Sequence, residues 1–481
     1  MIFSKLNEKW KNIPLATKVS VSYTICSILQ RCISFITLPL FTRLLTTEQY
    51  GQATIYSSWS SLLVIFLTLQ LPYGSFNTAM IKFEKKRDQY IGSVQGICFS
   101  LSCVFLLIYF PFSSQWNKLF ELPTLLVVVM VIQILADSGL AFWSGKKRFE
   151  FKYKEVIAVT LASSILSPIV QYFFVINSVE KGYARIIGGA IVSIAIGGTI
   201  FVLSFTKGKN FYNKEFWKYA LEFNIPLLTY YLSQMIFNTS DRIMISHMVG
   251  TDKAAIYGVA YSLAVMLNFV LTAINNSYVP WFYKKLKIGK QDDNKLVANA
   301  ISVLMALLLL GIIWFAPEII YVMAGREYAD AKWIVPPVAM SILLLFYSQL
   351  SINFEFFFEE KKSLVKASIW AAATNVILNA AFIPVFGYYV AGYTTLISYI
   401  LFAVMNYLTM TNILKTRNVA SHGFDTRALI LIFVLFLIAG FLGMALYEFK
   451  FIRLGISVIA LILIMRNYKR FVGIWRKIKV G

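Results

Sequence analysis

The amino-acid sequence predicts an all-helical integral membrane protein with about fourteen transmembrane helices. Three observations support this prediction. Of the 481 residues, 58% are hydrophobic and only 14% are charged, whereas about 25% of an ordinary soluble domain is charged. The mean hydropathy is +0.68. The apolar residues also gather in runs of the ~20 residues that a helix needs to cross a bilayer. A soluble fold could not bury this much apolar surface, so lipid must surround most of the chain.

The apolar runs follow one another along the whole chain, with short connections between them. The longest connection on the predicted outer side, near 113–122, has about ten residues, which is too short for a folded domain. The predicted spans lie near 19–41, 53–72, 91–112, 123–143, 155–177, 184–205, 224–248, 255–281, 297–323, 333–354, 364–385, 388–411, 427–447 and 450–466.

The net charge of +22 would also fit a nucleic-acid-binding protein, but the positions of the basic residues exclude that class. Lys and Arg concentrate in every second connection, as the positive-inside rule describes for cytoplasmic loops. Eight such segments hold 34 of the 45 basic residues, the alternate connections hold nine, and Arg31 and Arg242 lie within spans. We therefore predict that both termini are cytoplasmic. The eight segments are 1–18, 82–90, 146–154, 207–218, 284–295, 361–366, 415–427 and 466–479.

Similar short sequences recur in the same order about 200 residues apart. Six predicted spans separate the members of each pair. Because six is even, the two units have the same orientation, which predicts a parallel repeat about an axis along the membrane normal. The pairs are TEQYGQA at 47–53 with TDK at 251–253 and YGVA at 257–260, FEKK at 83–86 with FYKK at 282–285, and FEFK at 149–152 with FEEK at 358–361.

The repeat divides the chain into three predicted parts. The N-lobe at 1–206 holds spans 1–6, and the C-lobe at 207–418 holds spans 7–12. The remaining part, at 419–481, holds the last two spans and a basic cytoplasmic tail. We expect the last two spans to lie at the periphery of the repeat.

Polar residues form a stripe along the first span, with Arg31 near its middle. The stripe comprises Tyr23, Ser27, Gln30, Arg31 and Ser34. A charge inside a membrane usually faces a water-filled cavity or an opposite charge. Arg31 is therefore expected to line a substrate cavity, to pair with a carboxylate such as Asp137 in the fourth span, or to do both.

Two further stripes lie on the seventh and eighth spans. The seventh carries Tyr231, Gln234 and Asn238, and the eighth carries Asn268, Thr272 and Asn275. Ordinary hydrogen bonds between helices can explain single Asn residues in a membrane. The concentration of polar side chains on spans 1, 7 and 8 favours a wet interior between the lobes. Near the outer end of the seventh span, Asp241 and Arg242 are expected to form a local ion pair of structural importance.

Two segments resemble signatures of polysaccharide repeat-unit flippases. The first is LPLFTRLLTTEQYG at 38–51, after the first span. The second is NTSDRIMI at 238–245, followed by VG at 249–250 and AIYG at 255–258. Together they resemble the O-antigen and exopolysaccharide flippases of the multidrug, oligosaccharidyl-lipid and polysaccharide exporter superfamily. The resemblance extends over roughly residues 15–415.

The resemblance implies two six-helix lobes around a central cavity, in the cytoplasmic membrane of a bacterium. It implies transport by alternating access of an oligosaccharide linked to undecaprenyl diphosphate, for O-antigen or another surface polysaccharide. A polysaccharide polymerase and chain-length proteins would be partners. A lipid II flippase and a multidrug antiporter of the same superfamily remain alternatives. Arg31 argues against the antiporter, because multidrug antiporters favour cationic substrates.

A membrane glycosyltransferase or polymerase is the competing class of function. Such enzymes usually carry catalytic groups in a sizeable outer loop, which this chain lacks. The two histidines, His247 and His422, have no carboxylate constellation around them for acid–base work. The sequence therefore predicts a protein that is not an enzyme, with no catalytic residue, no metal site and no cofactor.

The charge pattern gives a topology that labelling can test. We expect Lys86→Cys and Lys285→Cys to resist a membrane-impermeant thiol reagent in intact cells and to react after permeabilisation, because both lie in predicted cytoplasmic loops. Lys118→Cys, on the predicted outer side, is the control and should react in intact cells. Labelling at position 86 or 285 in intact cells would overturn the map.

Overall fold

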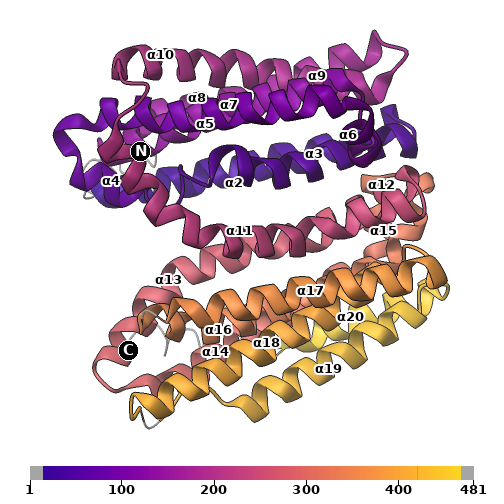
Figure 1. Ribbon diagram of the computed structural model, residues 1–481. Helices are drawn as coiled ribbons and strands as arrows, with labels where there is room; N and C mark the ends of the chain where they lie inside the picture. The colour runs from indigo at the N-terminus through magenta and orange to yellow at the C-terminus, as the bar shows by residue number, and fades with distance from the viewer. Residues whose placement is uncertain (1–14, 359, 420, 467–481) are drawn as a thin grey trace, which may run out of the picture. The chain divides into compact units, whose positions relative to one another are not determined.

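The computed structural model describes residues 15–358, 360–419 and 421–466, and every regular element in this part of the chain is helical. The predicted cytoplasmic ends of the chain, 1–14 and 467–481, lie outside the described residues. The chain divides into two compact units, Met1–Ser246 and His247–Gly481. Figure 1 shows the helices of both. The predicted all-helical fold is confirmed.

The first unit contains the elements from α2 to α11. Helices α9, η3 and α10 form one continuous helix, within which η3 is a short π-helix. The elements are α2 (Leu15–Leu44), α3 (Thr47–Thr68), α4 (Phe76–Lys82), η1 (Glu84–Lys86), α5 (Arg87–Tyr109), η2 (Phe110–Phe112), α6 (Ser113–Phe120), α7 (Thr124–Phe149), α8 (Tyr153–Ile176), α9 (Lys181–Ser193), η3 (Ile194–Gly198), α10 (Thr199–Gly208) and α11 (Lys214–Met248).

The second unit contains the elements from α12 to α20. A turn of 3-10 helix, η4, separates α12 from α13 within the eighth predicted span. The elements are α12 (Thr251–Ala264), η4 (Val265–Leu267), α13 (Asn268–Lys287), η5 (Gln291–Asp293), α14 (Asn294–Trp314), α15 (Ala316–Met323), η6 (Arg326–Trp333), α16 (Val335–Phe357), α17 (Lys361–Phe386), α18 (Val390–Thr416), α19 (Thr426–Ala445) and α20 (Lys450–Arg466).

Each predicted span overlaps a helix, but the number of membrane crossings stays a prediction. In the described part of the chain, 11 helical segments are long and apolar enough to cross a membrane. Helices α3, α11 and α20 are not among them. Helix α20 has 17 residues, and α3 and α11 carry many polar side chains. The two compact units also place nearly all of α11 with the first six predicted spans, so the lobe boundary at residue 206 stays a prediction.

The two motifs behind the family resemblance have a local structural basis. Thr46 caps α3: its hydroxyl accepts a hydrogen bond from the Gln49 backbone N–H at 3.3 Å, and the Gln49 side chain accepts one from the Thr46 N–H at 3.2 Å. This reciprocal capping box fixes where α3 begins. In the second motif, Gly250 has φ +142° immediately before α12, a conformation that other residues rarely adopt.

A buried ion pair holds α20 to α15 in the second unit. The Arg453 side chain, which is 1% exposed, donates a hydrogen bond to the Glu318 carboxylate. The Tyr447 ring lies 5.4 Å from the Arg453 guanidinium, and its hydroxyl donates to the Ile313 carbonyl at 2.7 Å. Because both charges of the pair have lost most of their water, removing one partner leaves the other uncompensated.

Breaking this pair is expected to destabilise the protein. Arg453→Met and Glu318→Leu should each lower the free energy of unfolding by about 3–5 kcal/mol, and the double variant should recover most of the loss. Unfolding in detergent micelles measures this. Lys332→Ala removes the pair of half-buried Lys332 with exposed Glu448 and should cost less than about 1 kcal/mol. A double variant as unstable as the single variants would contradict the account.

Candidate functional site

The structure places Arg31 on an exposed face of α2, near the middle of the helix. Within the described residues, its guanidinium has neither an ion pair nor a hydrogen bond. No ion pair joins it to Asp137 in this part of the chain. A guanidinium presents five N–H donors in a planar fork and remains charged at any physiological pH. Arg31 is therefore able to bind an anion without first breaking a protein contact.

The other members of the α2 stripe lie around Arg31 in two settings. Ser27 and Ser34 are also exposed, and the Ser34 hydroxyl donates to the Gln30 carbonyl at 3.1 Å. Gln30 is half-buried and its side-chain amide donates to the Ser164 hydroxyl of α8 at 3.1 Å. At the predicted cytoplasmic end, the Tyr23 ring lies 5.1 Å from the Arg148 guanidinium of α7. The stripe thus combines a free cation with neutral hydrogen-bonding groups.

Helix α11 carries the second stripe within the same unit. Tyr231, Gln234 and Asn238 are all half-buried, and the Asn238 amide donates to the Gln234 carbonyl at 2.7 Å. Asp241 is 1% exposed, whereas the neighbouring Arg242 is half-buried. The ion pair expected between these two residues stays a prediction.

The third stripe lies in the second unit. Asn268 and Asn275 are half-buried and Thr272 is exposed. The Thr272 hydroxyl donates to the Asn268 carbonyl at 2.7 Å, and the Asn275 amide donates to the Gln349 side chain of α16. The structure therefore assigns a helix-to-helix hydrogen bond to Asn275. That the three stripes line one cavity stays a proposal.

Asp137 lies near the middle of α7 with an exposed side chain. Its carboxylate accepts a hydrogen bond from the Ser193 hydroxyl at the end of α9. One turn earlier on α7, the Gln133 side chain accepts a hydrogen bond from the Tyr56 hydroxyl of α3 at 2.8 Å. Sequence reasoning missed Ser193 and Tyr56 as neighbours of the Asp137 region, because hydropathy gives no information on which spans pack together.

A second arginine of the first unit also lacks a carboxylate partner in the described residues. The Arg185 guanidinium of α9 lies 4.6 Å from the Phe41 ring and 4.4 Å from the Tyr50 ring. Cation–π contacts of this kind stabilise a desolvated guanidinium. Arg185 lies at the start of the span predicted at 184–205, whereas α9 already begins at Lys181.

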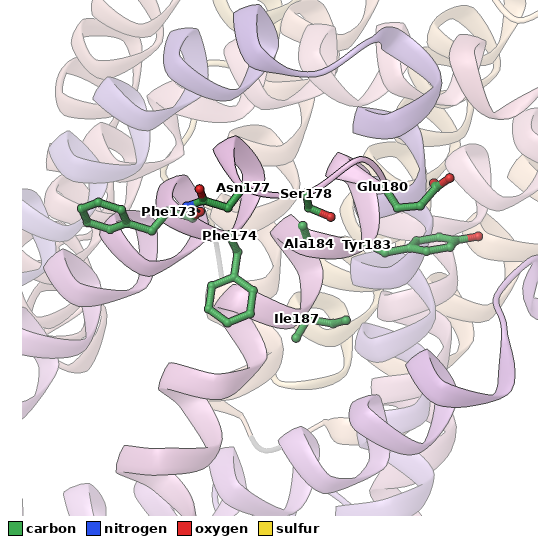
Figure 2. Close-up of a pocket in the computed structure, with 8 residues that line it drawn as sticks. All are labelled: Phe173, Phe174, Asn177, Ser178, Glu180, Tyr183, Ala184 and Ile187. Atoms are coloured by element: carbon green, nitrogen blue, oxygen red, sulfur yellow. Dashed lines mark hydrogen bonds between the residues drawn. The ribbon is translucent and has the colours of Figure 1, made fainter.

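Two surface hollows of the first unit share Tyr183. One has a volume of about 530 Å³ and lies at the turn from α8 to α9. Figure 2 shows Glu180 and Tyr183 extending to one side of it and Phe173 to the other. The second hollow, of about 600 Å³, lies along α6 and the turn before α7 and includes Lys118 and Glu121.

A third hollow is an apolar groove between α2 and α8. Its volume is about 500 Å³, and its lining differs from that of the other two hollows because it is mostly aliphatic. None of the predicted cavity residues lines any of these three hollows. The groove is lined by Ile33, Ile36, Thr37, Leu40, Ile165, Pro168, Ile169 and Tyr172. Among the residues that the structure describes, no group of three or more His, Cys, Asp or Glu side chains could hold a metal ion.

Two solved structures are similar to this chain in fold. A multidrug resistance MATE family transporter of the MOP superfamily, in an inward-facing conformation, has a TM-score of 0.65 at 13% identity and covers 81% of this chain and 96% of its own. The lipid II flippase MurJ, in an inward closed conformation, has a TM-score of 0.63 at 15% identity and covers 91% of this chain and 100% of its own. At these identities the likeness concerns the fold alone.

Sequence comparison identifies the family. A Haemophilus influenzae protein described as Lsg locus putative protein 1 is 22% identical over 359 residues, which is 73% of this chain and 87% of the relative. An uncharacterized membrane protein of the same organism is 22% identical over 372 residues, 76% of this chain and 89% of the relative. Residues 16–286, more than half of the chain, match the profile of the polysaccharide biosynthesis protein family. The chain is therefore a multi-pass membrane protein that belongs to the polysaccharide biosynthesis protein family and has the fold of MOP superfamily transporters.

Proposed function

We propose that this protein is a flippase that carries an oligosaccharide linked to undecaprenyl diphosphate across the bacterial cytoplasmic membrane, for O-antigen or another surface polysaccharide. The observation that carries the proposal is Arg31, a cation without a protein partner in the described residues at the middle of a membrane-spanning helix. Membership of the polysaccharide biosynthesis family and the transporter fold support a membrane flippase.

The chemistry of the substrate explains why an unpaired arginine would be retained there. An isolated anion taken from water into hydrocarbon loses solvation free energy of the order of tens of kcal/mol. A cation in a polar cavity offsets part of this loss. The guanidinium fork can donate two parallel hydrogen bonds to phosphate oxygens, which a lysine ammonium cannot do in the same geometry.

The neutral polar groups of the three stripes would form hydrogen bonds with the sugars of the substrate. Ser27, Ser34 and Thr272 are exposed hydroxyls, and hydroxyl groups both donate to and accept from sugar hydroxyls. The polyprenyl tail would stay in lipid, because acyl chains are as apolar as any protein groove. We propose that alternating access moves the head group to the outer leaflet, where a polymerase and chain-length proteins would take it over.

If Arg31 binds the diphosphate, its replacement should reduce the export of surface glycan. Arg31→Ala should abolish surface glycan while the protein remains inserted and abundant, because the diphosphate loses its cation. Arg31→Lys should restore only part of the export, since an ammonium lacks the planar fork. Surface glycan and membrane abundance are measured in the same cells. Lys154→Ala, an exposed cation outside the middle of the span, is the control and should export normally.

A structural role for Arg31 predicts different results. If Arg31 only neutralises Asp137, the single variant should accumulate poorly, and Arg31→Gln combined with Asp137→Asn should recover. Normal export by a well-expressed Arg31→Ala protein would refute the proposal. Accumulation of a peptidoglycan precursor in place of a glycan intermediate would instead identify a lipid II flippase.

A further inference from the structure

Asp137 is a mid-membrane carboxylate to which the proposed function assigns no role. It lies near the centre of α7 with its side chain exposed, and the Ser193 hydroxyl donates a hydrogen bond to it. No cation pairs with it in the described part of the chain. An ionised Asp at the centre of a span is costly in hydrocarbon, and such residues usually mark ion or proton pathways.

The charged groups of the surrounding helices lie far from Asp137. Of the helices packed against α7, α3 brings the Tyr56 hydroxyl to the Gln133 side chain, one turn before Asp137. The charged residues of α3, α4, α5, α6, α8 and α10 lie at or near the helix ends. On α9, Arg185 lies eight residues before Ser193, a separation of roughly 12 Å along the helix axis. The basic residues of α7 itself begin at Lys146, more than two turns away.

Close helix packing fixes the position of Ser193 beside Asp137. A Cβ atom at Gly197 would lie 2.5 Å from the Ala136 carbonyl oxygen, and one at Gly139 would lie 2.6 Å from the Phe201 Cβ. Glycine therefore lets α7 and the α9–η3–α10 helix approach closely on both sides of Asp137. The π-helix η3 starts immediately after Ser193, and π-helical segments inside α-helices often occur at functional sites.

We propose that Asp137 is a reversible proton-binding site and that its proton couples this transporter to a proton gradient. A hydronium ion from the outer water would transfer its proton to a carboxylate oxygen, forming an O–H bond and leaving a neutral carboxyl. Release to a water molecule on the inner side would restore the carboxylate. One proton moves inward per cycle and no other reactant is consumed.

The groups around the Asp137 carboxylate favour binding of a proton over binding of a metal ion. A metal ion needs several oxygen ligands, whereas the described residues offer one carboxylate here. That carboxylate accepts a hydrogen bond from Ser193, and the nearby Gln133 oxygen accepts one from Tyr56. A proton needs one oxygen. Protonation would remove the unpaired charge from the hydrocarbon, and the Ser193 hydroxyl could stay in place as donor to the carboxyl oxygen.

The proton site itself can be tested without any substrate. Infrared difference spectra of the purified full-length protein in lipid nanodiscs are recorded between acidic and alkaline buffer. We expect a carboxyl C=O band that appears on acidification, is absent in Asp137→Asn and returns at a shifted frequency in Asp137→Glu. Asp252→Asn, which removes an exposed carboxylate beside Lys253, should keep the band. A difference spectrum unchanged by Asp137→Asn would overturn the proton site, and a band that follows sodium concentration at constant pH would overturn it in favour of a metal ion.

Coupling rests on the proposed flippase function and needs a second measurement. In cells, export of surface glycan should rise when the outer medium is acidified, and Asp137→Asn should make export insensitive to this gradient while leaving membrane abundance unchanged. An Asp137→Asn protein that keeps the wild-type response would overturn the coupling and leave the flippase standing. If surface glycan is unchanged in cells that lack the protein, the flippase function is overturned and the coupling with it. The infrared result would still decide the proton site.

Discussion

A charge in hydrocarbon must be neutralised by an opposite charge, hydrated or protonated away, and this constraint governs the two residues on which the proposals for this protein rest. Arg31 and Asp137 have opposite charges, lie near the middle of their helices and belong to the same compact unit. A salt bridge between them would satisfy both and leave neither available. In the described residues they do not form one, so each retains its capacity to bind an ion. The hydrogen bond from Ser193 partly solvates Asp137, and no group in the described part of the chain occupies the donors of Arg31.

The same constraint explains how the rest of the polar groups are used. Arg453, to which no function is assigned, is paired: it is almost fully buried but bonded to Glu318. A buried amide of the second unit is also paired, since Asn379 donates to the Asn375 side chain at 3.3 Å. An unpaired ion at mid-span is costly in hydrocarbon and therefore a strong indication of function.

The sequence predicted much of the fold and less of the site, for physical reasons. Runs of apolar residues located the long helices because the bilayer sets their length, and the polar stripe on α2 follows from helical spacing alone. The division of a span into α12, η4 and α13 has no signature in hydropathy. Partners such as Ser164 for Gln30 and Ser193 for Asp137 come from other helices, and a single sequence does not reveal which helices are neighbours.

The proposed substrate is an oligosaccharide linked to undecaprenyl diphosphate. The most direct test is to identify the lipid that accumulates when the protein is depleted. The lipid-linked intermediates of the inner leaflet would be extracted from depleted cells and identified by mass spectrometry. We expect an oligosaccharide linked to undecaprenyl diphosphate to accumulate on the cytoplasmic face while surface glycan falls. Accumulation of lipid II, or unchanged lipid-linked intermediates with normal surface glycan, would contradict it.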